Sequence, residues 1–387
     1  MNCRTMALAL ASTIALAACA GAAAPASAPA SPSPAAASAA AKPAASAATN
    51  AAPASTAASA GQASAKPAAS ASAGQPASIK ISNIGVSGGV LPLYTTIEAG
   101  IFKQNGLDVE SNSLTTSSAA TVAALVSGQL QVAWTDGTSA VNAKAGGADL
   151  TVIATIHPAY SYLLETTPAI KTGADLKGKK LAVSSLTGTD AVATKLALAK
   201  LGIDWQKDVT LVATGDNASR TAALIGGSVD GTLQEPPGSL LLEEKGFHPV
   251  ADLGPMNLPS VNASLIVSSA YLAQHRDVLQ KFADSIVQGI AREKKDKPFA
   301  VKVLQKYFKS DDDKTMGIVY DYYLPNTPSL PVPKAELFTA AINELSKENP
   351  KMKDVDVSKV IDASFINSAG DRKLDQALPQ QTTNSTP

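Results

Sequence analysis

Residues 79–100 read IKISNIGVSGGVLPLYTTIEAG, and this stretch decides the fold. Its first six residues alternate apolar and polar side chains, as a half-buried strand does. A glycine-rich turn follows, and residues 91–100 then place apolar side chains at helical spacing and end on a glycine, as helices commonly do. Because this order of strand, turn and helix recurs along the chain, the sequence predicts an α/β fold with a largely parallel sheet covered on both faces.

The alternation of strands and helices continues in two series. The first series predicts strands at 107–114, 130–134 and 150–156, and helices at 118–128 and 138–145. The second begins after Asp175 and predicts strands at 180–184, 209–213 and 229–233, and helices at 190–201 and 219–226. Residues 261–267 predict a strand that returns to the first series, and further helices are predicted at 270–294, 298–308 and 335–347.

Two lobes joined by two crossings of the chain, with a helical C-terminal extension, describe a hinged binding protein. The predicted first lobe comprises residues 78–160 and 258–375, and the predicted second lobe comprises residues 161–257. We expect the hinge near residues 161–165 and 257–262 and a flexible tail at 376–387.

The N-terminus has the pattern of a signal peptide, residues 1–18. Arg4 precedes an apolar run, residues 6–18, that is too short to span a bilayer. The run ends in Leu16-Ala17-Ala18-Cys19, which resembles the bacterial lipobox, where the thiol is acylated and the chain is cut just before it. We therefore expect lipidation of Cys19 and an extracytoplasmic protein anchored to the bacterial cell membrane. The alternative is an ordinary secretory peptide with an incidental cysteine.

Composition limits what the rest of the chain can be. Residues 20–77 are almost entirely Ala, Ser, Pro and Gly, so together with Cys19 they predict a disordered tether at 19–77. The other cysteine, Cys3, lies in the removed segment, which leaves no thiol for a disulfide or for catalysis. Removing Arg4 with the signal peptide leaves 31 basic against 32 acidic residues, a formal charge of −1 that argues against a nucleic-acid partner.

Three motifs suggest chemistry, and each has a simpler explanation. Residues 85–89 match the G-x-S-x-G turn of hydrolases but follow the first strand, so they are better explained as a turn whose backbone N–H groups approach a ligand. Residues 173–180 nearly form a P-loop, but Lys180 stands where Ser or Thr is required. The acidic run at 310–314 lacks the spacing of a calcium loop, and the three histidines show no ligand spacing. We expect no metal, no cofactor and no enzymatic activity.

The loops after the predicted strands are rich in hydroxyl, amide and carboxylate groups. In open α/β sheets ligands bind beyond the carboxyl ends of the strands, where helix N-termini present free N–H groups. The predicted ligand-binding residues in these loops are Ser87, Gly88, Gly89, Ser117, Ser118, Thr135, Asp136, Ser185, Gly188, Thr189, Asp190, Asn217, Gln234 and Glu235. For each of them, simple helix capping is the alternative.

Three aromatic residues, Tyr94, Trp134 and Tyr160, lie near the same predicted edge and complete the predicted site. Trp134 ends a buried strand, so its ring could form the floor of a pocket, with core packing as the alternative. We expect the fluorescence of Trp134, and not that of Trp205, to respond to the ligand.

Charge in these loops leaves the polarity of the ligand open. Helix N-termini favour an anionic group, yet Arg220 is the single arginine of the loops. Several carboxylates lie in or beside them, so a donor-bearing or cationic ligand is as plausible as an anion. One hypothesis is that Asp136 and Glu235 contact the ligand from opposite lobes.

The opening of the folded part resembles a known family. Residues 89–94 (GVLPLY), 98–102 (EAGIF) and 105–109 (NGLDV) are similar to the start of alkanesulfonate-, nitrate- and taurine-type periplasmic binding proteins, a family that includes binders of thiamine-pyrimidine precursors. The resemblance implies the type II periplasmic-binding-protein architecture and a solute-binding protein for an ABC permease with a separate ATPase. We expect the binding protein to be a monomer. It also implies a sulfonate, a nitrate-like anion or a thiamine-pyrimidine-type compound as ligand.

Two other classes of protein remain as alternatives. The superfamily includes pyrimidine-precursor synthases, but those use a cysteine-rich metal motif that is absent from this chain. A surface lipoprotein without a transport role would use the Ala/Pro-rich segment as a stalk and would need no cleft.

Overall fold

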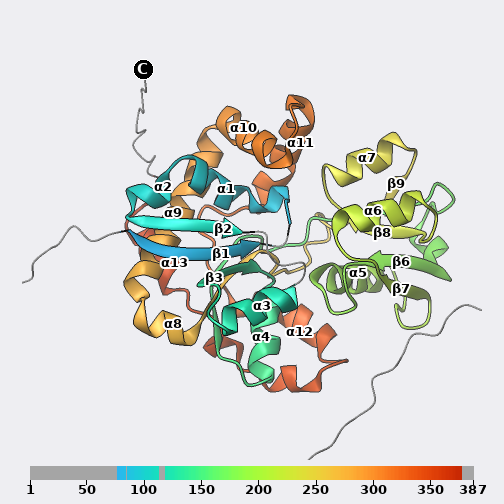
Figure 1. Ribbon diagram of the computed structural model, residues 1–387. Helices are drawn as coiled ribbons and strands as arrows, with labels where there is room; N and C mark the ends of the chain where they lie inside the picture. Colours follow the sequence, from blue (N-terminus) through green and yellow to red (C-terminus); the bar gives the residue numbers. More distant parts are fainter. Residues whose placement is uncertain (1–75, 84, 113–117, 377–387) are drawn as a thin grey trace, which may run out of the picture. The chain divides into compact units, whose positions relative to one another are not determined.

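The computed structural model describes residues 76–83, 85–112 and 118–376 (Figure 1). Within these residues no helix has both the length and the apolar character needed to cross a membrane. The predicted signal peptide, Cys19, nearly all of the predicted tether, Ser117 and all but the first residue of the predicted tail lie outside the described residues.

The first sheet has the strand order β2-β1-β3-β10-β4. Its strands are β1 (Ala77–Asn83), β2 (Leu107–Asn112), β3 (Val132–Thr135), β4 (Leu150–Thr155) and β10 (Ser264–Ser268). Strand β1 pairs parallel with β2 and β3, whereas β10 pairs antiparallel with β3 and β4. The predicted strand at 261–267 is therefore β10, and it does return to the first sheet.

The second sheet has the order β7-β6-β8-β5-β9. Its strands are β5 (Leu163–Thr166), β6 (Lys179–Val183), β7 (Val209–Ala213), β8 (Gly231–Gln234) and β9 (His248–Asp252). Strand β6 is parallel to β7 and β8, and β5 is antiparallel to β8 and β9. Each sheet is thus parallel except for one strand, and that strand is the first one after the chain crosses from the other sheet.

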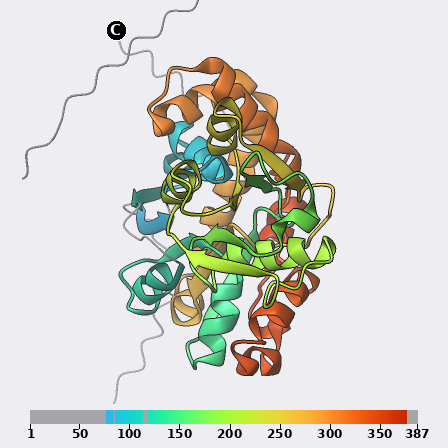
Figure 2. The ribbon, with the colours of Figure 1, turned by 90° about the vertical axis from the view of Figure 1, so that its right-hand side faces the viewer.

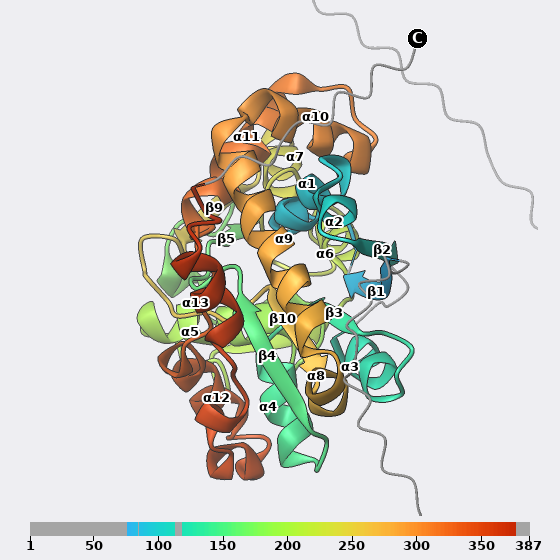
Figure 3. The same ribbon diagram turned by 90° about the vertical axis from the view of Figure 1, so that its left-hand side faces the viewer.

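Helices cover both faces of the first sheet and build two apolar clusters. On one face lie α1 (Leu91–Glu98), α2 (Ile101–Gln104), α9 (Arg276–Lys295), α10 (Lys297–Phe308), α11 (Asp313–Tyr323) and α13 (Ser364–Asp371). Figure 3 shows α9 between α2 and α13, and α9 also packs along α1. The other cluster includes residues of α3 (Ser118–Val126), α4 (Thr138–Ala145) and α12 (Thr339–Leu345). The amphipathic helices of the C-terminal extension thus complete the core of the first sheet.

The second sheet is covered by α5 (Thr189–Lys200), α6 (Asn217–Ile225) and α7 (Gly238–Glu244). Figure 2 looks onto this part of the chain, drawn in green and yellow. Its main apolar cluster includes Leu181 of β6 and Leu198 of α5, and a smaller cluster beneath α6 and α7 includes Leu224 and Leu242. Both clusters are buried, so each face of the sheet has its own core.

The two segments that cross between the sheets are hydrogen-bonded to each other. The N–H of Tyr160 donates to the carbonyl of Leu258 at 3.0 Å, and the N–H of Ser260 donates to the carbonyl of Pro158 at 2.9 Å. An isolated antiparallel bridge joins Ala159 and Pro259 between them. The two crossing segments therefore form one paired connection between the sheets.

Two predicted helices have other boundaries in the structure. The predicted helix 270–294 is divided at His275 (φ −132°, ψ 36°) into α8 (Ser269–Gln274) and α9. The predicted helix 335–347 begins as a 3-10 turn, Ala335–Phe338, before α12 starts at Thr339. Several elements were not predicted: α2, β5, α7, β9, α11 and α13. Most of them are short, and short segments carry too little periodicity to be recognised.

Candidate ligand-binding site

The candidate site lies where loops at the carboxyl ends of strands from the two sheets meet. The loops after β1 and β3 belong to the first sheet, and the loops after β6 and β8 belong to the second. Two hydrogen bonds join them directly: Ser87 Oγ donates to Glu235 Oε1 at 3.0 Å, and Thr189 Oγ1 donates to Asp136 Oδ2 at 2.6 Å. These loops include most of the predicted site residues, so the structure brings the predicted positions together.

Ser87 and Glu235 stand at the centre of the first of these contacts. Ser87 caps the 3-10 turn Gly88–Val90 by accepting a hydrogen bond from the N–H of Gly89 at 3.1 Å. Its hydroxyl also lies 3.2 Å from the hydroxyl of Tyr323, and Asn217 Nδ2 lies 3.4 Å from Glu235 Oε1. Burial raises the pKa of Glu235, while its hydrogen bonds with Tyr323 and Ser87 partly oppose that rise.

Asp136 follows β3 and accepts three hydrogen bonds. Its Oδ1 accepts from the N–H of Thr138 at 2.9 Å, and its Oδ2 accepts from the hydroxyls of Thr138 at 2.7 Å and of Thr189. Only 6% of its surface is exposed. Burial raises the pKa of this carboxyl, although the three hydrogen bonds lower it. The acid is therefore fully engaged by protein groups from both sheets.

Arg220 on α6 is buried, and most of its donors are occupied within the second sheet. Its Nη1 donates to the carbonyl of Gly215 at 3.0 Å and lies 3.4 Å from Asp190 Oδ2, while its Nη2 donates to Asn217 Oδ1. Asp190 in turn accepts from the N–H and the hydroxyl of Ser184, at 2.6 and 2.5 Å. This guanidinium positions the loops around α5 and α6, and it presents no free fork for a planar anion.

Three buried side-chain oxygens at strand ends lack a hydrogen-bond partner among the described residues: the carboxamide oxygen Asn83 Oδ1, the hydroxyl Thr135 Oγ1 and the carboxamide oxygen Gln234 Oε1. They belong to the last residues of β1, β3 and β8. The amide nitrogens of Asn83 and Gln234 are used, since Asn83 donates to the carbonyl of Gly85 at 2.6 Å and Gln234 to Thr221 Oγ1 at 2.9 Å. Buried acceptors of this kind are normally paired, so they mark positions where a donor-bearing group would be stabilised.

The remaining predicted residues have mixed surroundings. Gly88 and Gly89 lie under the ring of Tyr323, and a Cβ at Gly88 would come within 2.5 Å of that ring. Gly188 precedes α5, Ser185 is exposed in the loop after β6, and Ser118 begins α3.

Each of the three predicted aromatic residues is buried. Tyr94 stacks on Tyr307 with ring centroids 3.7 Å apart, and its hydroxyl lies 3.3 Å from Asn83 Nδ2. Trp134 is 3% exposed and belongs to the apolar cluster formed with α1 and α9, and Tyr160 belongs to the main cluster of the second sheet. A role of Trp134 as the floor of a pocket stays a prediction.

Three residues of this region were not predicted: Asn83, His157 and Tyr323. His157 Nε2 lies 2.9 Å from the carbonyl of Gly89, its Nδ1 lies 3.4 Å from the carbonyl of Asn326, and burial lowers its pKa. The strand pattern could have identified Asn83, because it is the last polar residue of β1. Nothing local distinguishes Tyr323, which comes from the C-terminal extension, 236 residues after Ser87.

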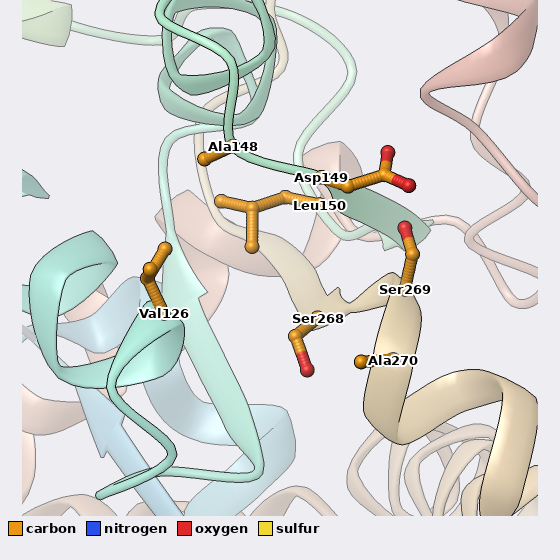
Figure 4. A pocket seen from close by; sticks show the side chains of 7 residues that line it. All are labelled: Val126, Ala148, Asp149, Leu150, Ser268, Ser269 and Ala270. Carbon is orange, nitrogen blue, oxygen red and sulfur yellow. The ribbon is translucent and has the colours of Figure 1, made fainter. Parts of the chain in front are cut away.

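A shallow surface hollow lies elsewhere, at the opposite edge of the first sheet (Figure 4). It is lined by Val126, Ala148, Asp149, Leu150, Ser268, Ser269 and Ala270, where β4 begins and β10 ends. Its one charged group, Asp149, is paired with Lys144 at 2.5 Å. Within the described residues, moreover, no cluster of His, Cys, Asp and Glu is placed to hold a metal ion. The polar groups converge at the strand ends instead, and we place the candidate site there.

Comparison with known proteins agrees with this architecture. The Bacillus subtilis (strain 168) protein YtlA, named as a candidate binding protein, is 26% identical over 221 residues, which are 54% of this chain and 64% of YtlA, less than two thirds of its length. The periplasmic aliphatic sulphonate binding protein SsuA of Escherichia coli is 19% identical, with a TM-score of 0.60 over 76% of this chain and 99% of SsuA. The desulfurization enzyme DSZB is 15% identical, with a TM-score of 0.58 over 77% of this chain and 99% of DSZB.

These structural likenesses show the fold, which is that of the periplasmic binding proteins, as the sequence predicted. The model of a protein family described as NMT1/THI5 like matches residues 88–296. That match covers more than half of the 387 residues and every strand of the two sheets except β1, and the chain therefore belongs to the NMT1/THI5-like family.

Proposed function

We propose that this protein is the solute-binding component of an ABC importer and captures a small organic molecule between its two sheets. The observation that carries the proposal is the meeting of the strand carboxyl ends of both sheets, where Ser87 contacts Glu235 and Asp136 contacts Thr189. Such an edge is where open α/β sheets bind ligands, and two lobes joined by two crossings can close around one. The permease and the ATPase would be separate subunits, and the binding protein would act as a monomer.

Binding without catalysis fits the contacts of the candidate nucleophile and of the nearest histidine. Ser87 is hydrogen-bonded to a carboxylate and lies beside a tyrosine hydroxyl, not a histidine. His157 directs both ring nitrogens at backbone carbonyls of Gly89 and Asn326. The serine of a hydrolase G-x-S-x-G turn is activated by a histidine, and both ring nitrogens of this histidine are occupied elsewhere.

The ligand that we propose bears hydrogen-bond donors and no strong negative charge. Arg220 is engaged by Asp190, Asn217 and a carbonyl, and the carboxylates of Asp136 and Glu235 lie at the same loop cluster. The sequence of residues 113–117, SLTTS, adds no cation. An anion brought near these carboxylates would be repelled, whereas N–H or O–H groups could pair with the free acceptors at the strand ends. A pyrimidine-type compound fits this pattern better than a sulfonate or a nitrate-like anion.

We further propose that the mature chain begins at an acylated Cys19 and is held at the outer side of the bacterial cell membrane by that lipid. Support comes from the residues Leu16-Ala17-Ala18-Cys19 and from the tether composition of residues 20–77. A single acyl chain binds membranes only weakly, so stable anchoring would need more than one chain on the N-terminal cysteine.

Denaturing mass spectrometry of the protein purified from its membrane tests these proposals together. We expect a released small molecule that rebinds saturably to the refolded protein, and an N-terminal peptide whose mass shows acylated Cys19. A released sulfonate or nitrate would overturn the assignment of ligand polarity, and turnover of the released molecule would overturn binding without catalysis. An unmodified N-terminus would remove the anchor, and the lack of any saturable ligand would contradict the transport role.

A further inference from the structure

The contacts between the two sheets at the site are reciprocal. A carboxylate from the first sheet, Asp136, accepts from a hydroxyl of the second, Thr189. A carboxylate from the second sheet, Glu235, accepts from a hydroxyl of the first, Ser87. Neither pair involves a cation, and each joins a loop after a strand of one sheet to a loop or helix start of the other.

We propose that these two pairs are clasps that hold the lobes together, and that Tyr323 is the positioning residue of the clasp formed by Ser87 and Glu235. In this arrangement Asp136 and Glu235 close the cleft and do not recognise the polar groups of the ligand. The inference rests on the proposed function, since it assumes two lobes that close, and it replaces the hypothesis that both carboxylates contact the ligand from opposite lobes.

Saturation of the acceptors supports this assignment. Asp136 accepts from the N–H and the hydroxyl of Thr138 in its own lobe and from Thr189 across the cleft. Local capping would need only the bonds from Thr138, so the bond across the cleft is additional. Glu235 is bonded by Ser87 and by Tyr323 from the first lobe, and Asn217 approaches it from the second. Few acceptor positions remain on either carboxylate for a ligand.

The surroundings of Tyr323 make it a positioning group. It ends α11 and is 5% exposed, and its ring covers Gly88, where a Cβ would meet the ring at 2.5 Å. Its hydroxyl lies 3.2 Å from Ser87 Oγ and is also bonded to Glu235. The ring therefore fixes the glycine turn of the first lobe while the hydroxyl reaches the carboxylate of the second.

Distances between spin labels in the ligand-free protein test the clasps without knowledge of the ligand. Cys3 and Cys19 are replaced by serine in the full chain, and labels are placed on new cysteines at exposed Val126 of α3 and exposed Leu241 of α7. Bound molecules are removed by unfolding the protein in denaturant, dialysing it and then refolding it. We expect Ser87→Ala, Tyr323→Phe and Thr189→Val each to lower the ratio of short to long inter-label distances about three- to tenfold, because each removes a hydrogen bond between the lobes.

Matched control variants distinguish the loss of a clasp from general destabilisation of the fold. Tyr320→Phe removes a hydroxyl of α11 that donates to the carbonyl of Glu293 within the first lobe, and Thr194→Val removes only a bond to a backbone carbonyl within α5. Both should leave the distances unchanged, and Ser87→Thr, which keeps the hydroxyl, should restore them. Circular dichroism and thermal unfolding check that each variant folds.

Unchanged distances in all three clasp variants would overturn the proposal, as would an equal loss in the two controls. The transport role is tested by the separate mass-spectrometry experiment, where its failure would be seen as the lack of a saturable ligand. The distances between the spin labels can be interpreted in either case.

Discussion

At the scale of single residues, the most unusual group is Glu165, a carboxylate on β5 in the core of the second sheet. The residue is 0% exposed, and neither carboxylate oxygen has a hydrogen-bond partner among the described residues. Burial, with a smaller contribution from the negative charge of Glu243, raises its pKa from 4.5 to about 7. A carboxyl of this kind is neutral in the folded protein under conditions where it is charged in the unfolded chain.

The raised pKa of Glu165 predicts that the stability of the protein decreases as the pH rises. Between pH 4.5 and about 7 the folded chain binds more protons than the unfolded chain, so the contribution of this group is full below 4.5 and is lost as the pH rises through 7. Glu165→Gln stays neutral at every pH and should therefore stabilise the protein by about 1 to 3 kcal/mol at pH 8 and by much less at pH 5. Urea unfolding at the two pH values measures this difference. The exposed Glu244→Gln serves as control, and a gain for Glu165→Gln that does not grow with pH would contradict the prediction.

At the scale of elements, the tightest contact between helices is that of α9 with α1. A Cβ on Gly289 of α9 would lie 1.9 Å from Thr96 Oγ1 and 3.0 Å from the carbonyl of Pro92. The Thr96 hydroxyl donates to that same carbonyl at 2.6 Å, so it cannot turn aside without losing its bond. The glycine is required here because the backbones of the two helices approach closely, although glycine disfavours a helix.

This close approach predicts opposite effects for two Gly→Ala changes in helices. Gly289→Ala should lower the free energy of unfolding by about 1 to 3 kcal/mol, because α9 must move away from α1. Gly317→Ala on α11 meets nothing within 4 Å and should raise it by about 0.5 to 1 kcal/mol through helix propensity. Thermal unfolding of both variants measures these changes. An unchanged free energy of unfolding in Gly289→Ala would contradict the prediction, because it would mean that the two helices move apart without loss of stability.

At the scale of the whole molecule, the C-terminal extension joins the two sheets a second time, away from the candidate site. Val192 of α5 shares an apolar cluster with Phe338 and Ile342 near α12. Beside them, Lys195 of α5 is 1% exposed, and its Nζ lies 2.6 Å from the carboxylate of Glu348. The same ammonium stands 4.3 Å from the ring centre of Trp205. The setting of Trp205 therefore depends on the contact of α5 with the C-terminal extension, which its local sequence did not indicate.

This contact changes what we expect from the two tryptophans. In a Trp134→Phe background, Glu348→Gln should shift the emission of Trp205 to longer wavelength, because Lys195 loses its partner and draws water toward the ring. It should also cost about 1 to 3 kcal/mol of stability, since a buried ammonium is left without its anion. Exposed Glu336→Gln in the same segment is the control. An unchanged spectrum would restore the earlier expectation that Trp205 does not sense movement of the lobes.

The sequence by itself determined the local structure of the protein. Alternating and helical periodicities predicted β1, α1, α4 and β7 closely, because each depends on side chains a few residues apart. The same reasoning placed Ser87, Asp136 and Glu235 after strands, since the carboxyl ends of parallel strands share one edge. Family membership and fold class followed from such local motifs, and both were confirmed.

Only the tertiary structure decided how those residues are used. Ser87 meets Glu235 across 148 residues and Tyr323 across 236, and nothing in the periodicity of any one segment encodes such pairs. Trp134 lies one residue before the end of β3, and its ring belongs to the apolar cluster formed with α1 and α9. Tertiary packing also decided the contact of Lys195 with Glu348, and it leaves the acceptor oxygens of Asn83 and Gln234 without a partner among the described residues. A hydrogen bond or an ion pair between distant residues exists only when packing has already brought both partners to the same place.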